Sequence, residues 1–98
     1  MSDRIRLDKW LWQARFFKSR SLSAAFVEGG HVRLNGTPVG KPAQPVGPGD
    51  VLTFVTGGRV RVLRLLACGT RRGPASEAQT LYREEGATAV PPKSTGGE

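Results

Sequence analysis

Residues 7–36 read LDKWLWQARFFKSRSLSAAFVEGGHVRLNG, and two apolar patterns within them are joined by a basic segment. In the first, four apolar residues recur at i, i+3, i+4 and i+7, namely Leu7, Trp10, Leu11 and Ala14. This spacing predicts a helix that begins near Leu7 and buries one stripe. An acid in the first turn, Asp8, suits the positive end of such a helix.

A second helix is expected over residues 20–28. Ser19 is a suitable N-cap, because its hydroxyl can accept a hydrogen bond from a backbone N–H two or three residues on. Gly29-Gly30 ends the helix, since glycine accepts the left-handed conformation at a helix C-terminus. We expect three residues to form the buried stripe: Leu22, Ala25 and Phe26.

The corner between the two helices carries three cations: Arg15, Lys18 and Arg20. A helix start presents unpaired backbone N–H groups and the positive end of the peptide dipoles, and it therefore attracts anions. Lys18 and Arg20 add positive charge at the same place. The corner is predicted to bind phosphate.

Short strands follow. Residues 32–34 alternate like a half-buried strand, and Asn35-Gly36 indicates a hairpin. Further strands are expected over residues 51–56 and 59–67. In the last of these, Arg64 falls on the parity opposite to Arg59 and Arg61, so we predict a β-bulge near Val62 and Leu63 that returns Arg64 to solvent.

The remainder reads as a basic loop over residues 68–73, then a short helix from Ala75 to Glu85 that begins after Pro74. Ala78, Leu81 and Tyr82 could dock this helix on the domain. Residues 86–98 are rich in Pro and Gly and are expected to form a disordered tail.

Composition points to a polyanionic partner. The 98 residues allow one domain, and their net charge is +7. Residues 1–41 hold eight Lys and Arg against three acids. The single cysteine, Cys68, excludes an internal disulfide and a thiol-based metal site. We see neither a signal segment nor a membrane span, and we expect a cytoplasmic protein.

Five segments together resemble the S4 domain: Arg6-Leu7-Asp8, Ser19-Arg20-Ser21, the run of residues 27–36, Lys41-Pro42 and Gly49-Asp50. The resemblance implies an α+β fold in which two N-terminal helices pack on a small, mostly antiparallel sheet. It also implies RNA binding. The implied domains are an S4 RNA-binding domain at 4–67, a packed basic loop and helix at 68–85, and the tail at 86–98.

Within that superfamily the chain most resembles the heat-shock protein fifteen family, through residues 6–12, 14–18, 71–78 and Leu81-Tyr82. The resemblance implies a ribosome-associated stress protein that binds ribosomal RNA. Its target would be a large ribosomal subunit that holds a stalled nascent chain on tRNA. Two departures stand out: residues 22–25 lack the acid and cations of many S4 domains, and the chain ends without the family's basic extension.

Pattern and resemblance together give the candidate RNA-binding residues: Arg6, Lys9, Arg15, Lys18, Ser19, Arg20, Ser21, Arg33, Asn35, Gly36, Lys41, Arg71 and Arg72. Asp8 is interpreted as structural. Asn35 and Gly36 are mainly a turn whose amides could reach a phosphate. Trp12 lies off the first stripe and either covers a second part of the core or offers a stacking surface.

Two alternatives to a stand-alone monomeric RNA binder stay open. One is a protein adaptor that docks a partner through the surface of Trp12 and Phe17. The other is an accessory module of an RNA-modifying enzyme. His31 and Cys68 lack partners at catalytic or metal-ligand spacing, so we expect no catalytic residues, no metal and no cofactor.

Overall fold

The computed structural model describes residues 4–89. Its main element is a five-stranded antiparallel sheet in the order β3-β2-β5-β6-β7. The strands are β2 (Val32–Leu34), β3 (Thr37–Val39), β5 (Val51–Thr56), β6 (Arg59–Leu65) and β7 (Tyr82–Ala89). A separate two-stranded pair joins β1 (Ile5–Arg6) to β4 (Pro45–Val46).

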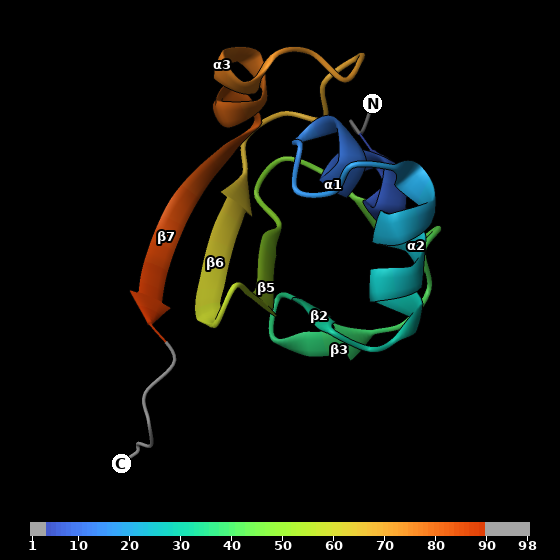
Figure 1. The fold of residues 1–98 in the computed structure, drawn as a ribbon, viewed down its shortest axis with the longest axis vertical. Helices are drawn as coiled ribbons and strands as arrows, with labels where there is room; N and C mark the ends of the chain where they lie inside the picture. Colours follow the sequence, from blue (N-terminus) through green and yellow to red (C-terminus); the bar gives the residue numbers. More distant parts are fainter. Residues whose placement is uncertain (1–3, 90–98) are drawn as a thin grey trace.

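Two helices, α1 (Leu7–Gln13) and α2 (Arg20–Glu28), lie together beside one end of this sheet, and β7 forms its opposite edge (Figure 1). The short helix α3 (Ala75–Ala78) and the 3-10 turn η1 (Gln79–Leu81) precede β7. The α+β architecture expected from the sequence is therefore confirmed.

The core forms where α1 meets the sheet. The predicted stripe of α1 is buried: Leu7, Trp10 and Leu11 are fully covered, and Ala14 is nearly so. The indole N–H of Trp10 donates to the carbonyl of Ala67 at 3.0 Å, which anchors α1 to the chain just after β6. From the sheet the core receives Val32, Leu52, Phe54, Leu63 and Leu65.

Helix α2 has the predicted bounds, but only one of the three residues predicted for its buried stripe, Phe26, packs against the core. Leu22 is 52% exposed and Ala25 is exposed, whereas Ser23 and Val27 are fully buried. The reason is a close approach of the two helices, since the Ser23 hydroxyl lies 2.7 Å from the Asp8 carbonyl in α1. This hydrogen bond, available to a small polar side chain, sets which face of α2 turns inward.

The hairpin at residues 34–37 is confirmed. Asn35 has φ 51° and Gly36 has φ 86°, so both central residues adopt the left-handed conformation that a tight turn between antiparallel strands requires. Gly36 tolerates this at little cost, and asparagine adopts the left-handed conformation more readily than most other residues with a side chain.

The predicted bulge occurs in a different strand. The ladder between β6 and β7 shifts register between Val62 and Leu63, but the extra residue is Glu85 of β7. Strand β6 pairs regularly with β5, with Arg61 opposite Phe54 and Leu63 opposite Leu52. Arg61 therefore shares the core side of the sheet, and Arg64 reaches solvent on the outer side without a bulge in its own strand.

The segment after Pro74 also differs from expectation. A helix is present but ends at Ala78, and residues 82–89 form β7 rather than the end of a helix and the start of a disordered tail. Pairing with β6 explains the difference, because a strand at the sheet edge satisfies its backbone groups through a neighbour far away in the sequence. Residues 90–98 of the expected tail lie outside the described residues.

Candidate nucleic-acid interface

The starts of α1 and α2 meet at one buried carboxylate. Asp8 is 3% exposed and accepts two hydrogen bonds from the Arg6 guanidinium, both at 3.1 Å. Arg20, the first residue of α2, lies 3.8 Å from the same carboxylate. Asp8 is thus structural, as expected from the sequence.

One acid shared by two guanidinium groups leaves a positive charge in excess. The side chains of Arg6 and Arg20 remain 51% and 43% exposed. Asp8 orients both groups without covering them, and each keeps N–H donors that face solvent. Pre-oriented guanidinium groups of this kind suit the oxygens of a phosphate.

The N-terminus of α2 adds backbone donors beside Arg20. Ser19 is the N-cap, as predicted, and its hydroxyl accepts a hydrogen bond from the Leu22 N–H at 3.1 Å. The first turn of this nine-residue helix carries no acidic residue. Its dipole and its exposed Ser21 therefore reinforce an anion-attracting surface.

Lys41 lies next to this surface. The loop after β3 contacts the start of α1 through two backbone bonds, from Leu7 N–H to the Gln44 carbonyl and from Asp8 N–H to the Pro42 carbonyl. Its Lys41 side chain is exposed. Lys9, in the first turn of α1, is half-buried, and its backbone N–H donates to the Asp8 carboxylate at 2.7 Å. We define the helix-start surface by Arg6, Lys9, Arg20, Ser21 and Lys41.

Arg15 and Arg72 have a different position. Arg15 donates to the Gly73 carbonyl at 2.9 Å, and Arg72 donates to the carbonyls of Trp12 and Phe17 at 3.1 and 3.2 Å. These bonds join residues 12–17 to residues 72–73, and we call them the arginine brace. Lys18 is exposed close by.

The brace also explains Trp12. The Arg72 guanidinium lies over its ring, 5.7 Å from the centroid, so the off-stripe tryptophan packs against a cation. Phe17 packs on Phe26, with ring centroids 5.0 Å apart. Both aromatic residues thus have partners within the fold, which weakens the adaptor alternative.

The hairpin candidates lie elsewhere. Arg33 is exposed and points away from the core, because its neighbours Val32 and Leu34 face inward. The Asn35 side chain joins the hairpin to β5, accepting from the Val51 N–H at 2.9 Å and donating to the Asp50 carboxylate at 3.2 Å. Asn35 and Gly36 act primarily as a turn, and any contact with phosphate stays a prediction.

Arg71 is exposed and paired. It bonds Glu77 at 2.8 Å, and the hydrogen bond to that carboxylate raises the pKa of Arg71 above its usual value. The thirteen candidates are thus distributed over the helix-start surface, the arginine brace and corner, the hairpin, and the loop of Arg71.

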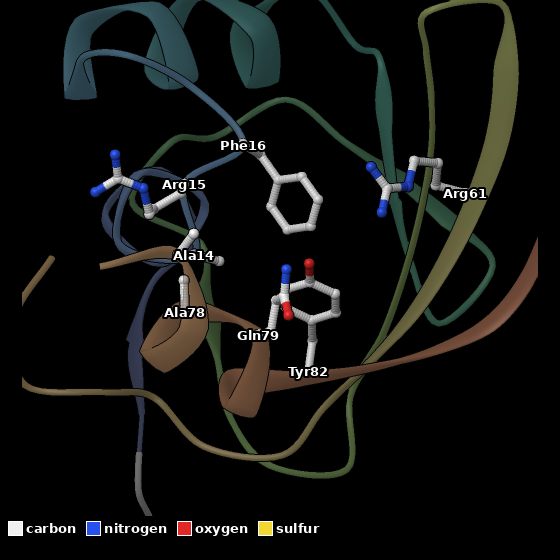
Figure 2. Close-up of a pocket in the computed structure, with 8 residues that line it drawn as sticks. Ala14, Arg15, Phe16, Arg61, Ala78, Gln79 and Tyr82 are labelled. Carbon is white, nitrogen blue, oxygen red and sulfur yellow. The ribbon is translucent and has the colours of Figure 1, made fainter. Parts of the chain in front are cut away.

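The sequence did not predict a role for Arg61. Arg61 lies over the Phe16 ring at 5.0 Å and bonds Glu84 twice at 2.8 Å. Together with Tyr82 and Gln79 it lines a pocket beside the corner (Figure 2). No local signal marks this group, because strand alternation alone assigned Arg61 to solvent.

Comparison with known proteins identifies the family. Residues 5–52 match the model of the S4 domain. A solved trimeric structure of Vibrio cholerae heat shock protein 15 has a TM-score of 0.78 and 44% identity, covering 83% of this chain and 81% of that one. The chain belongs to the S4-domain family.

Two further S4-family relatives differ in length. Heat shock protein 15 of Escherichia coli K12 is 45% identical over 80 residues, which cover 82% of this chain but only 59% of the relative. The RQC P-site tRNA stabilizing factor of Bacillus subtilis is 31% identical, with 83% of this chain and 95% of the relative covered. The S4-domain chain thus spans about three fifths of the first relative and nearly all of the second.

Residues 4–89 contain no group of three or more His, Cys, Asp or Glu side chains placed to hold a metal ion. None of the helices in this range is long and apolar enough to span a bilayer.

Proposed function

We propose that this S4-domain chain binds structured ribosomal RNA on the large ribosomal subunit and acts in the rescue of stalled nascent chains. The observation that carries the proposal is the helix-start surface, where Arg6 and Arg20 share the buried Asp8 and remain half-exposed. The chain's net charge of +7 attracts a polyanion, and the oriented guanidinium groups hold its phosphates.

The relatives support the cellular context. One is named heat shock protein 15, and another is named a P-site tRNA stabilizing factor. A cytoplasmic stress protein that binds the large subunit and its peptidyl-tRNA agrees with both names. We assign it a binding role without catalysis, and we propose that it acts as a monomer, in contrast to the trimeric structure of the Vibrio cholerae relative.

Two variants, each of which lacks one positive charge at a different place, test the proposal. Arg20→Gln is expected to weaken binding to purified large subunits roughly tenfold and to reduce the salt dependence by about one counterion. The matched control is Arg83→Gln, because Arg83 is 75% exposed in β7 and pairs only loosely with Glu85, at 3.9 Å. Co-sedimentation at low and raised salt measures both variants.

The control decides how the result is interpreted. Arg83→Gln should bind within about twofold of the unmodified chain, since it removes only one charge of the net +7 and lies in the edge strand β7, outside the helix-start surface. Equal losses in both variants would mean that net charge, rather than the helix-start surface, holds the RNA. Arg20→Glu, which adds repulsion, should abolish most of the binding.

A further inference from the structure

We propose that the pocket beside the corner binds a single unpaired nucleobase of the RNA, an inference that rests on the proposed function. The pocket has a volume of about 230 Å³ and is formed by three parts of the chain: residues 14–16, Arg61 of β6, and residues 75–82. It is smaller than the ~300–1,000 Å³ typical of sites for drug-sized ligands, and its size suits one base.

Two aromatic rings line the pocket. Phe16 and Tyr82 are half-buried, with ring centroids 5.0 Å apart at an angle of 45° (Figure 2). The Trp10 ring packs against both of these rings, with its centroid 6.2 Å from each, and the Phe54 ring packs against Phe16 with centroids 5.5 Å apart. Because Trp10 and Phe54 are buried, the rings are held in place before any ligand arrives, and unpaired bases stack on such surfaces.

Polar groups lie beside the rings. Gln79 is exposed, and its side-chain amide has no hydrogen-bond partner within residues 4–89. Figure 2 shows this amide and the Tyr82 hydroxyl on the side of the pocket that faces Phe16. An amide offers both a donor and an acceptor, which matches the edge of a base.

The charge of the pocket also suits a nucleotide. Glu84 would repel a phosphate, but Arg61 bonds its carboxylate twice at 2.8 Å, so the ion pair as a whole carries no net charge. The Arg61 guanidinium stays over the Phe16 ring, and Figure 2 shows it directed toward the pocket. Arg15 at the rim points outward, where the phosphates of an extruded nucleotide would pass.

The test compares two RNA hairpins that differ by one unpaired adenine, replaced in a parallel probe by fluorescent 2-aminopurine. The full chain should bind the bulged hairpin at least about fivefold more tightly than the fully paired one and quench the 2-aminopurine. Gln79→Ala and Tyr82→Phe should remove that preference while leaving the affinity for the paired hairpin unchanged. Ser76→Ala, an exposed change in α3 outside the pocket, should keep the preference.

The outcomes separate this inference from the proposed function. Arg20→Gln should lower the affinity for both hairpins by the same factor, so the ratio of the two affinities should not change. The nucleobase site is overturned, with RNA binding left in place, if the chain binds both hairpins equally well. The same holds if the pocket variants lower the affinity for both hairpins equally.

If neither hairpin binds, the proposed function fails, and the pocket is tested with AMP and UMP alone through the NMR shift of the Gln79 side-chain amide. A shift that Tyr82→Phe removes supports the site, whereas a shift caused only by an aromatic tripeptide overturns it in favour of a protein partner.

Discussion

Arg61 shows how single residues in this chain acquire roles that their neighbours in sequence do not reveal. Its guanidinium lies on the core side of the sheet, opposite Phe54, where an unpaired charge would be costly. Glu84 supplies the counter-charge at 2.8 Å, and the Phe16 ring covers the guanidinium at 5.0 Å. The hydrogen bond to Glu84 raises the pKa of Arg61, although burial opposes the rise.

This pair predicts a pH-dependent contribution to stability. The pKa of Glu84 is lowered from 4.5 in the folded state, mainly by the hydrogen bond from Arg61, so the folded state favours the ionised carboxylate. The contribution is therefore present above about pH 4.5 and is lost as the pH falls through the lower, folded-state pKa. Because the pair is partly exposed, its size should be about 1 kcal/mol or less.

Urea unfolding of the unmodified chain and of Glu84→Gln, from pH 7 to pH 3, measures the effect. The two stabilities should differ at neutral pH and converge as the medium becomes acidic. A difference that persists undiminished at pH 3 would show that the variant acts through packing instead of charge.

Among the elements, the corner between α1 and α2 depends on a segment nearly sixty residues away in sequence. The arginine brace satisfies the carbonyls of Trp12, Phe17 and Gly73. Arg15 itself has φ 66°, a left-handed conformation that a residue with a side chain adopts at a cost. The brace therefore stabilises a backbone path that the corner sequence alone does not favour.

Alanine variants of two adjacent arginines test whether the arginine brace stabilises the fold. Arg72→Ala should lower the free energy of unfolding by about 1–3 kcal/mol, because two part-buried carbonyls lose a charged donor. Arg71→Ala removes an equal charge one residue away but only an exposed ion pair, and it should cost much less stability than Arg72→Ala. Chemical denaturation measures both, and similar losses would argue against the brace.

For the molecule as a whole, the fold extends past the part that defines the family. The S4 match covers residues 5–52, yet Leu81 belongs to the core and Tyr82 packs against it. Strand β7 completes the sheet by pairing along β6. The division into domains at 4–67, 68–85 and 86–98 remains a prediction, and the continuous sheet favours one cooperative unit through residue 89.

Truncation distinguishes these descriptions. A chain that ends at Ala67 should lose cooperative thermal unfolding, since it lacks β7, Leu81 and the Cys68 carbonyl that accepts from the buried Gln13 at 3.0 Å. A chain that ends at Ala89 keeps every described strand and should unfold cooperatively. Circular dichroism during heating measures both, and a stable, cooperative chain ending at Ala67 would establish an independent domain.

The sequence by itself determined the elements whose signals are local. The stripe of α1, the Ser19 cap and the Asn35-Gly36 hairpin follow from side-chain spacing and turn chemistry within a few residues, and the S4 motif located the cations of the helix-start surface. The tertiary structure alone decided the inward face of α2, the strand over residues 82–89, the core-side position of Arg61 and the brace from Arg72. Each depends on a partner distant in the chain, and hydrogen bonding or packing with that partner outweighs local periodicity.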